Sequence, residues 1–128
     1  MNSDFDTRIK KLVLIVDDDQ EIAESMRIAL EAVGYRVLVA RDGNTGLALA
    51  ERENPNLLIL DMMMPKRSGF LVLETLRQTN KSPSRIIMIT ANEGNRHKEY
   101  AKQLGVDEYI RKPFPMDILL DAVERIIA

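Results

Sequence analysis

The sequence has no cysteine, no tryptophan and a single histidine. The missing cysteine excludes disulfides, thiol nucleophiles, Cys-ligated zinc and iron–sulfur clusters. A reducing cytoplasm is the compartment in which such a chain is expected. The histidine, His97, falls in a predicted surface helix, and we expect no functional role for it.

Long apolar runs and an excess of one charge are missing too. No run approaches the ~18 apolar residues that a membrane span requires, and residues 1–6 carry acids where a signal peptide carries basic residues. The 18 Lys and Arg residues nearly balance the 20 Asp and Glu residues, whereas a nucleic-acid-binding surface is strongly basic. We therefore expect neither a membrane nor a nucleic acid as a direct partner.

The chain of 128 residues has the size of one domain, and 45% of it is apolar. A chain of this length buries roughly two-thirds of its unfolded surface and needs no covalent or metal cross-link to fold. We expect a short polar tail over residues 1–10 and one folded domain over residues 11–128.

Short apolar, β-branched runs alternate along the chain with segments that have apolar residues at helical spacing. The expected strands are Leu12–Val16, Tyr35–Ala40, Leu57–Leu60, Arg85–Thr90 and Glu108–Arg111. The expected helices are Glu21–Val33, Thr45–Glu53, Phe70–Gln78, Arg96–Leu104 and Met116–Ile127. Such alternation predicts an α/β fold, a doubly wound, five-stranded parallel sheet with helices on both faces.

Polar side chains stand at the carboxyl ends of expected strands one, three, four and five. In open parallel sheets, ligands bind outside the carboxyl ends of the strands. The fold would therefore gather side chains that are far apart in the sequence. They are Asp17, Asp18, Asp61, Thr90 and Lys112.

Three carboxylates at one sheet edge need a counter-charge, because two of them ~5 Å apart repel by about 3 kcal/mol at an effective dielectric constant near 20. Mg²⁺ suits an all-oxygen site of this kind and leaves room for a phosphate oxygen. Lys112 adds a point charge and Thr90 a hydroxyl donor, both suited to a phosphoryl group. A carboxylate in this setting can attack phosphorus.

Asp61 is the expected nucleophile because it stands alone on the central strand, whereas Asp17 and Asp18 form a vicinal pair suited to hold the ion.

The segments that carry these residues resemble, in order and spacing, the motifs of bacterial response-regulator receiver domains of two-component signalling. The matching segments are Leu12–Asp19, Leu58–Pro65, Ile89–Ala91 and Gly105–Phe114. The resemblance runs over about residues 10–128 and implies a flavodoxin-like strand order 2-1-3-4-5, as in chemotaxis regulators, with a cis Lys112–Pro113 peptide bond. It implies a phosphoprotein that takes a phosphoryl group from a histidine kinase or phosphotransfer protein and switches a face that binds a downstream protein target.

Carried over residue by residue, the resemblance makes Asp61 the phospho-acceptor and places Thr90 and Lys112 against the phosphoryl group. The Mg²⁺ ligands that it implies are Asp17, Asp18, Asp61 and the backbone carbonyl of Met63. Such a domain is a signalling module that catalyses only its own phosphorylation and dephosphorylation. Two positions would modulate the lifetime of the phosphorylated state, Met63 and Asn92, because they border the path of the attacking water.

The resemblance also implies an aromatic switch at Tyr109. Our hypothesis is that Thr90 moves toward the phosphoryl group and Tyr109 turns inward to fill the space. Residues of the partner-binding face, placed by helix and strand periodicity, are Tyr100, Gln103, Asp107 and Arg111. The donor would dock near the first helix, where Ile22 and Ser25 are candidates for kinase choice.

Two other protein classes stay open, as does the question whether the chain is a whole protein or part of a longer one. A Mg-dependent phosphatase of the haloacid-dehalogenase type would use Asp17 and Asp19, which have its Asp-x-Asp spacing, but it would leave Asp61 without a task. A flavodoxin would share the fold, yet aspartates after strand one would repel its anionic phosphate. Within the receiver interpretation, the chain is either a stand-alone regulator or a receiver excised from a longer protein.

Overall fold

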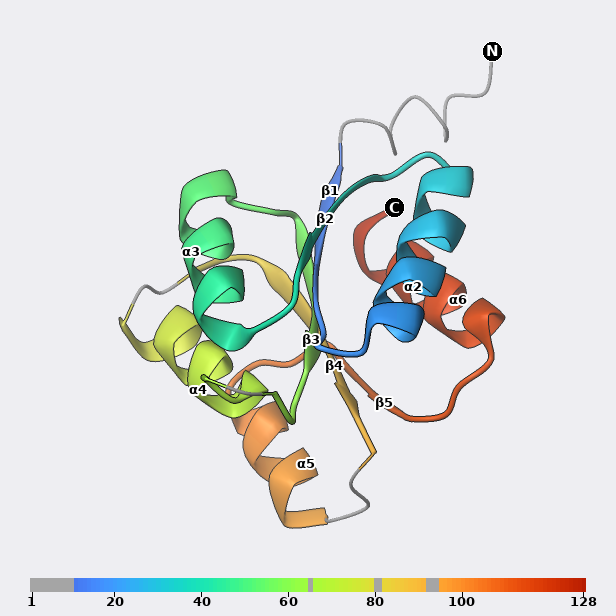
Figure 1. Cartoon of the computed structure of the whole chain (residues 1–128). Helices are drawn as coiled ribbons and strands as arrows, with labels where there is room; N and C mark the ends of the chain where they lie inside the picture. The colour runs from blue at the N-terminus through green and yellow to red at the C-terminus, as the bar shows by residue number, and fades with distance from the viewer. Residues whose placement is uncertain (1–10, 65, 80–81, 92–94) are drawn as a thin grey trace.

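The computed structural model describes residues 11–64, 66–79, 82–91 and 95–128, without the side chains of residues 95–97. In these residues one parallel sheet has the strand order β2-β1-β3-β4-β5, which confirms the predicted order (Figure 1). The strands are β1 (Leu12–Val16), β2 (Arg36–Ala40), β3 (Leu57–Asp61), β4 (Arg85–Thr90) and β5 (Glu108–Arg111). The predicted tail, residues 1–10, lies outside the described residues.

Helices cover both faces of the sheet, as predicted. They are α2 (Gln20–Ala32), α3 (Gly43–Glu53), α4 (Gly69–Glu74) with the π-helical turn η1 (Thr75–Thr79), α5 (Asn95–Gln103) and α6 (Met116–Ile127). Helices α2 and α6 lie on one face, and α3, α4 and α5 lie on the other (Figure 1). None of the helices formed by the described residues is long and apolar enough to cross a membrane.

The core is divided by the sheet into two layers, because successive strand residues point to opposite faces. Val13 and Ile15 of β1 pack with α2 and α6, whereas Leu14 and Val16 pack with α3 and α4. Every residue of β1 and β3 is buried, as expected for strands covered on both faces. Asp61 ends β3, the central strand of the sheet.

Strand β2 begins at Arg36, one residue later than predicted. The backbone N–H of Tyr35 donates to the carbonyl of Leu30 over 3.1 Å, so this residue closes the end of α2 instead of opening the strand. Gly34, with φ of 106°, makes the reversal between the two elements. The apolar, buried character of Tyr35 thus comes from its place in the core and not from a strand.

The predicted helix Phe70–Gln78 is divided into α4 and the π-helical turn η1. The change begins at Thr75, whose hydroxyl donates to the carbonyl of Leu71 over 2.8 Å. A threonine hydroxyl bonded to the preceding turn competes with the backbone ladder and bends helices. Hydrophobic spacing could not predict the change, because it does not register this local hydrogen bond.

Candidate functional site

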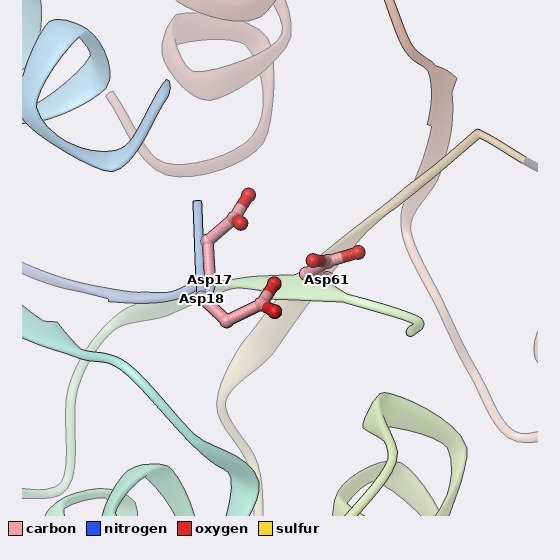
Figure 2. Close-up of side chains that lie close together, drawn as sticks. All are labelled: Asp17, Asp18 and Asp61. Atoms are coloured by element: carbon pink, nitrogen blue, oxygen red, sulfur yellow. The ribbon is translucent and has the colours of Figure 1, made fainter. Parts of the chain in front are cut away.

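The carboxyl ends of β1 and β3 bring three carboxylates together (Figure 2). Asp17 and Asp18 follow β1, and Asp61 ends β3. One oxygen from each lies within 4.8 Å of the others, as the sequence predicted. Asp17 and Asp61 are buried, with 1% and 5% of their surface exposed, whereas Asp18 is exposed.

Backbone hydrogen bonds to neighbouring strands fix both buried aspartates. The N–H of Asp17 donates to the carbonyl of Ala40 over 3.1 Å, so β2 holds the end of β1. Asp61 is in register with Ile89 of β4, and the next N–H, of Met62, donates to the carbonyl of Ile89 over 2.9 Å. Both buried aspartates therefore stand where β1 and β3 are still hydrogen-bonded to neighbouring strands.

Lys112 faces both buried aspartates from the end of β5. Its backbone N–H donates to the carbonyl of Thr90 over 2.7 Å, and its Nζ lies 3.1 Å from Oδ2 of Asp17 and 3.5 Å from Oδ2 of Asp61. Burial opposes the charge of the ammonium, but the two carboxylates outweigh it and raise the pKa of Lys112. The peptide bond Lys112–Pro113 is cis, as the resemblance implied.

The surroundings of the Asp61 carboxyl group disfavour its ionised form. Burial, followed by the charge of Asp17, raises its pKa to about 7, although Lys112 and the N–H of Met63 act in the opposite direction. Lys112 therefore does not fully offset the burial of Asp61 and its repulsion by Asp17. A further cation bound here would stabilise the ionised forms of Asp17 and Asp61.

The donor atoms fit a hard divalent cation. Apart from its ion pair with Lys112, the buried Oδ2 of Asp17 accepts no hydrogen bond within the described part of the chain. The N–H of Met63 donates to Oδ1 of Asp61 over 3.3 Å, so the segment after β3 folds back toward the carboxylates. Carboxylate and carbonyl oxygens are the ligands that Mg²⁺ takes.

Tyr109 contacts both Thr90 and Met62. Thr90 is fully buried, and Met62 is 1% exposed. Burial raises the pKa of the Tyr109 phenol, and a hydrogen bond with Thr90 opposes this shift. The Tyr109 hydroxyl also donates to Sδ of Met62 over 3.7 Å. The predicted switch pair is therefore in contact, and Met62, which was not predicted to take part, completes it.

The four residues predicted for a partner face do not line one surface cavity. Gln103 and Asp107 line a cavity of about 630 Å³ together with Arg77, whereas Arg111 lines a different one between β5 and α6. Asp107 accepts from the N–H of Ile86 over 2.9 Å and so supports the start of β4. Tyr100 donates to Glu74 of α4 over 2.7 Å.

Two further predictions concern Asn92 and His97. Asn92 lies outside the described residues, as does the side chain of His97. Met63, the other residue predicted to modulate lifetime, is 64% exposed directly after the buried Asp61 and Met62.

Asp19 does not join the carboxylate group. Its side chain accepts from the N–H of Ile22 over 3.1 Å and caps α2. Its own N–H donates to Oδ1 of Asp17 over 2.9 Å. The Asp-x-Asp spacing of Asp17 and Asp19 is thus explained by helix capping.

Comparisons with known proteins agree with this site. The model of the family described as "Response regulator receiver domain" matches residues 13–124. The chain is 42% identical over 102 residues to the transcriptional regulatory protein CpxR of Klebsiella pneumoniae, over 80% of this chain and 43% of the relative. It is 41% identical over 106 residues to the alkaline phosphatase synthesis transcriptional regulatory protein PhoP of Bacillus subtilis, over 83% of this chain and 44% of the relative.

A solved structure with the same fold is the CheY-like response regulator receiver domain protein of Methanospirillum hungatei. The two chains are 33% identical, with a TM-score of 0.84, over 90% of this chain and 91% of the other. This chain spans less than half of the curated relatives CpxR and PhoP. The comparisons give no support to a phosphatase of the haloacid-dehalogenase type.

Proposed function

The chain belongs to the response regulator receiver domain family, and we propose that Asp61 is the residue on which it accepts a phosphoryl group. The observation that carries this assignment is the position of Lys112, whose Nζ lies between the buried carboxylates of Asp17 and Asp61. The donor is a phosphohistidine of a histidine kinase or phosphotransfer protein, since receiver domains interact with histidine kinases.

The proposed reaction is an in-line transfer to a carboxylate. An oxygen of Asp61 attacks phosphorus and forms a P–O bond, while the P–N bond to the donor imidazole breaks and its electron pair stays on nitrogen, which takes a proton from water. Lys112, 3.5 Å from Asp61, favours the ionised nucleophile and then pairs with a phosphoryl oxygen. Thr90 would donate its hydroxyl to another phosphoryl oxygen.

Receiver domains bind Mg²⁺ at a cluster of aspartates, and such a cluster is present here. We propose Asp17, Asp18, Asp61 and the carbonyl of Met63 as the ligands. When bound, the ion offsets negative charge on the transferring phosphoryl group. The domain would catalyse only its own phosphorylation and dephosphorylation, with Met63 and Asn92 beside the path of water.

The donor docks, in this proposal, on a cavity of about 610 Å³ between α2 and the β5–α6 connection. The cavity is lined by Lys112, so it opens beside the carboxylates. Ile22 and Ser25, the two candidates for kinase choice, line it as well. Ile28, which is 57% exposed, offers an apolar contact on the same helix.

Phosphorylation is proposed to change the surface around α5, β5 and α6 through Thr90 and Tyr109. The output would be a contact with a downstream protein in the cytoplasm, and not with a nucleic acid through this domain. Of the residues proposed for that contact, Tyr100, Gln103 and Arg111 are exposed, whereas Asp107 is engaged in the fold.

Intact-mass analysis after incubation with Mg²⁺ and a small acyl phosphate tests the assignment. A phosphoryl adduct is expected on the wild type and on the matched surface variant Asp121→Asn, which changes an exposed carboxylate of α6. The adduct is expected to be absent from Asp61→Asn and after addition of a chelator. An adduct on Asp61→Asn, or none on the wild type, would refute the proposal.

A further inference from the structure

The start of α3 contacts the segment that precedes α4. Nε of Arg67 donates to Oδ1 of Asn44 over 2.9 Å. Beside this hydrogen bond, Nζ of Lys66 lies 3.8 Å from Oδ2 of Asp42. Two polar contacts therefore connect the start of α3 and its N-cap, Asp42, with Lys66 and Arg67 before α4.

Close backbone packing supports the same contact. A Cβ atom at Gly43 would lie 1.9 Å from the carbonyl oxygen of Arg67, so only glycine permits the observed approach. The start of α3 is itself fixed, because Asp42 caps the helix by accepting from the N–H of Thr45 over 2.9 Å. Helix α3 in turn packs closely on β1, where Gly46 meets the side chain of Val16.

The far end of the segment is also held. The N–H of Gly69 donates to the carbonyl of Met62 over 2.9 Å, and a Cβ atom at Gly69 would lie 2.1 Å from the carbonyl oxygen of Asp61. Residues 66–69 are thus anchored to β3 through Gly69 and to α3 through Arg67. Met63 lies between Asp61 and these two anchors.

We propose that Arg67 is a positioning residue for the carboxylate site, acting through its hydrogen bond to Asn44. By holding Arg67, the bond would limit the orientations open to Met63, four residues earlier, whose N–H donates to Asp61. The inference rests on the proposed function in one respect, because that proposal makes Asp61 the acceptor and Met63 a Mg²⁺ ligand. Residues that orient metal ligands affect metal affinity without touching the ion.

The test compares Arg67→Ala, Asn44→Ala and the double variant in ¹⁵N-labelled protein. Two quantities are measured by NMR: the amide shift of Met63 without metal, and the Kd for Mg²⁺ in a titration with the ion alone. Arg52→Ala is the matched control, because Arg52 is an exposed arginine of α3 that makes a similar contact, to Glu53 over 3.0 Å.

Each single variant is expected to move the Met63 amide signal and to raise the Kd about three- to tenfold. The effect should not exceed that of removing a group hydrogen-bonded directly to a metal ligand, which costs about tenfold or more. The double variant should match the worse single variant, because both remove one hydrogen bond. Arg52→Ala should leave both quantities unchanged. If Arg67→Ala does not fold, Asn44→Ala tests the same bond from an exposed position.

An unchanged Kd in both single variants, or effects that multiply in the double variant, would overturn the positioning role. Failure of the proposed function looks different. In that case the wild type takes no phosphoryl group on Asp61, while the Met63 signal and the Mg²⁺ affinity still respond to Arg67→Ala.

Discussion

The hydroxyl of Tyr109 donates to Sδ of Met62 over 3.7 Å. The ring expected to turn inward on phosphorylation therefore already packs against the layer of the core beneath α3 and α4. Its hydrogen bond with Thr90 connects it to the residue proposed to bind the phosphoryl group. We therefore expect phosphorylation to change how tightly Tyr109 is held, through its contact with Thr90.

Thr90→Ala is expected to uncouple Tyr109 from phosphorylation. In the wild type, the Thr90 hydroxyl should leave Tyr109 and donate to a phosphoryl oxygen instead. This change should shift the NMR signals of the Tyr109 ring. In Thr90→Ala, the same signals should change little when Asp61 is phosphorylated by a small acyl phosphate. Tyr100→Phe is the control, because it removes a hydrogen bond to Glu74 on the surface. Equal responses of Tyr109 in wild type and Thr90→Ala would contradict the coupling.

Asp61→Asn is expected to stabilise the metal-free protein at neutral pH. The folded state raises the Asp61 pKa from 3.8 to about 7, so the folded protein keeps a proton that the unfolded chain has released. Stability of the wild type therefore falls as pH rises from about 4 to 7, and Asn lacks this loss. One pKa unit corresponds to about 1.4 kcal/mol; with allowance for Lys112 and solvent, a gain of about 2 kcal/mol is expected above pH 7.

Urea unfolding with chelator, at several pH values, measures this difference. The advantage of Asp61→Asn should be small near pH 4, grow up to pH 7 and then stay constant. Asp121→Asn should show no such profile, because Asp121 is exposed. A constant difference at all pH values would mean that Asp61 has an ordinary pKa.

Most of the fold follows from hydrophobic periodicity. The predicted bounds of β1, β4, β5 and α6 match the structure, because their apolar patterns end at polar or turn residues. The pattern fails where a single local hydrogen bond decides the backbone, as at Tyr35 and at Thr75. Neither bond leaves a trace in the spacing of apolar residues.

The candidate site was predictable to the extent that it depends on strand ends. Asp17, Asp61, Thr90 and Lys112 meet because parallel strands end at one edge of the sheet. The contact of Arg67 with Asn44 was not predictable, since it joins the first turn of α3 to the segment before α4, 23 residues further along the sequence, and this approach depends on Gly43. A single contact between a helix start and a loop leaves no periodic signal in the sequence.

Gly69→Ala is expected to destabilise the protein and to weaken Mg²⁺ binding. A Cβ atom at this position would meet the Asp61 carbonyl oxygen at 2.1 Å, so the backbone must move at a cost of about 1–3 kcal/mol. Gly105→Ala is the control: it is strained by a φ of 80° but lies at the other end of β5 from Lys112. Urea unfolding and a Mg²⁺ titration should show a loss of stability in both variants and a higher Kd in Gly69→Ala alone.

Ile28→Glu is expected to slow phosphoryl transfer from a protein donor and to leave transfer from a small acyl phosphate unchanged. The side chain lines the proposed docking cavity, whose rim already carries Glu21 and Glu24. A carboxylate there would replace an apolar contact with the donor worth about 1.4 kcal/mol, which corresponds to a tenfold loss in rate at low donor concentration. Leu71→Glu is the matched control, because Leu71 is 52% exposed on α4 and does not line this cavity. Rates would be measured with a histidine kinase that phosphorylates the wild type. Equal slowing by both variants would show that the added negative charge is the cause. Slowing with the acyl phosphate would show damage to the carboxylate site. Either result would remove the support for docking at α2.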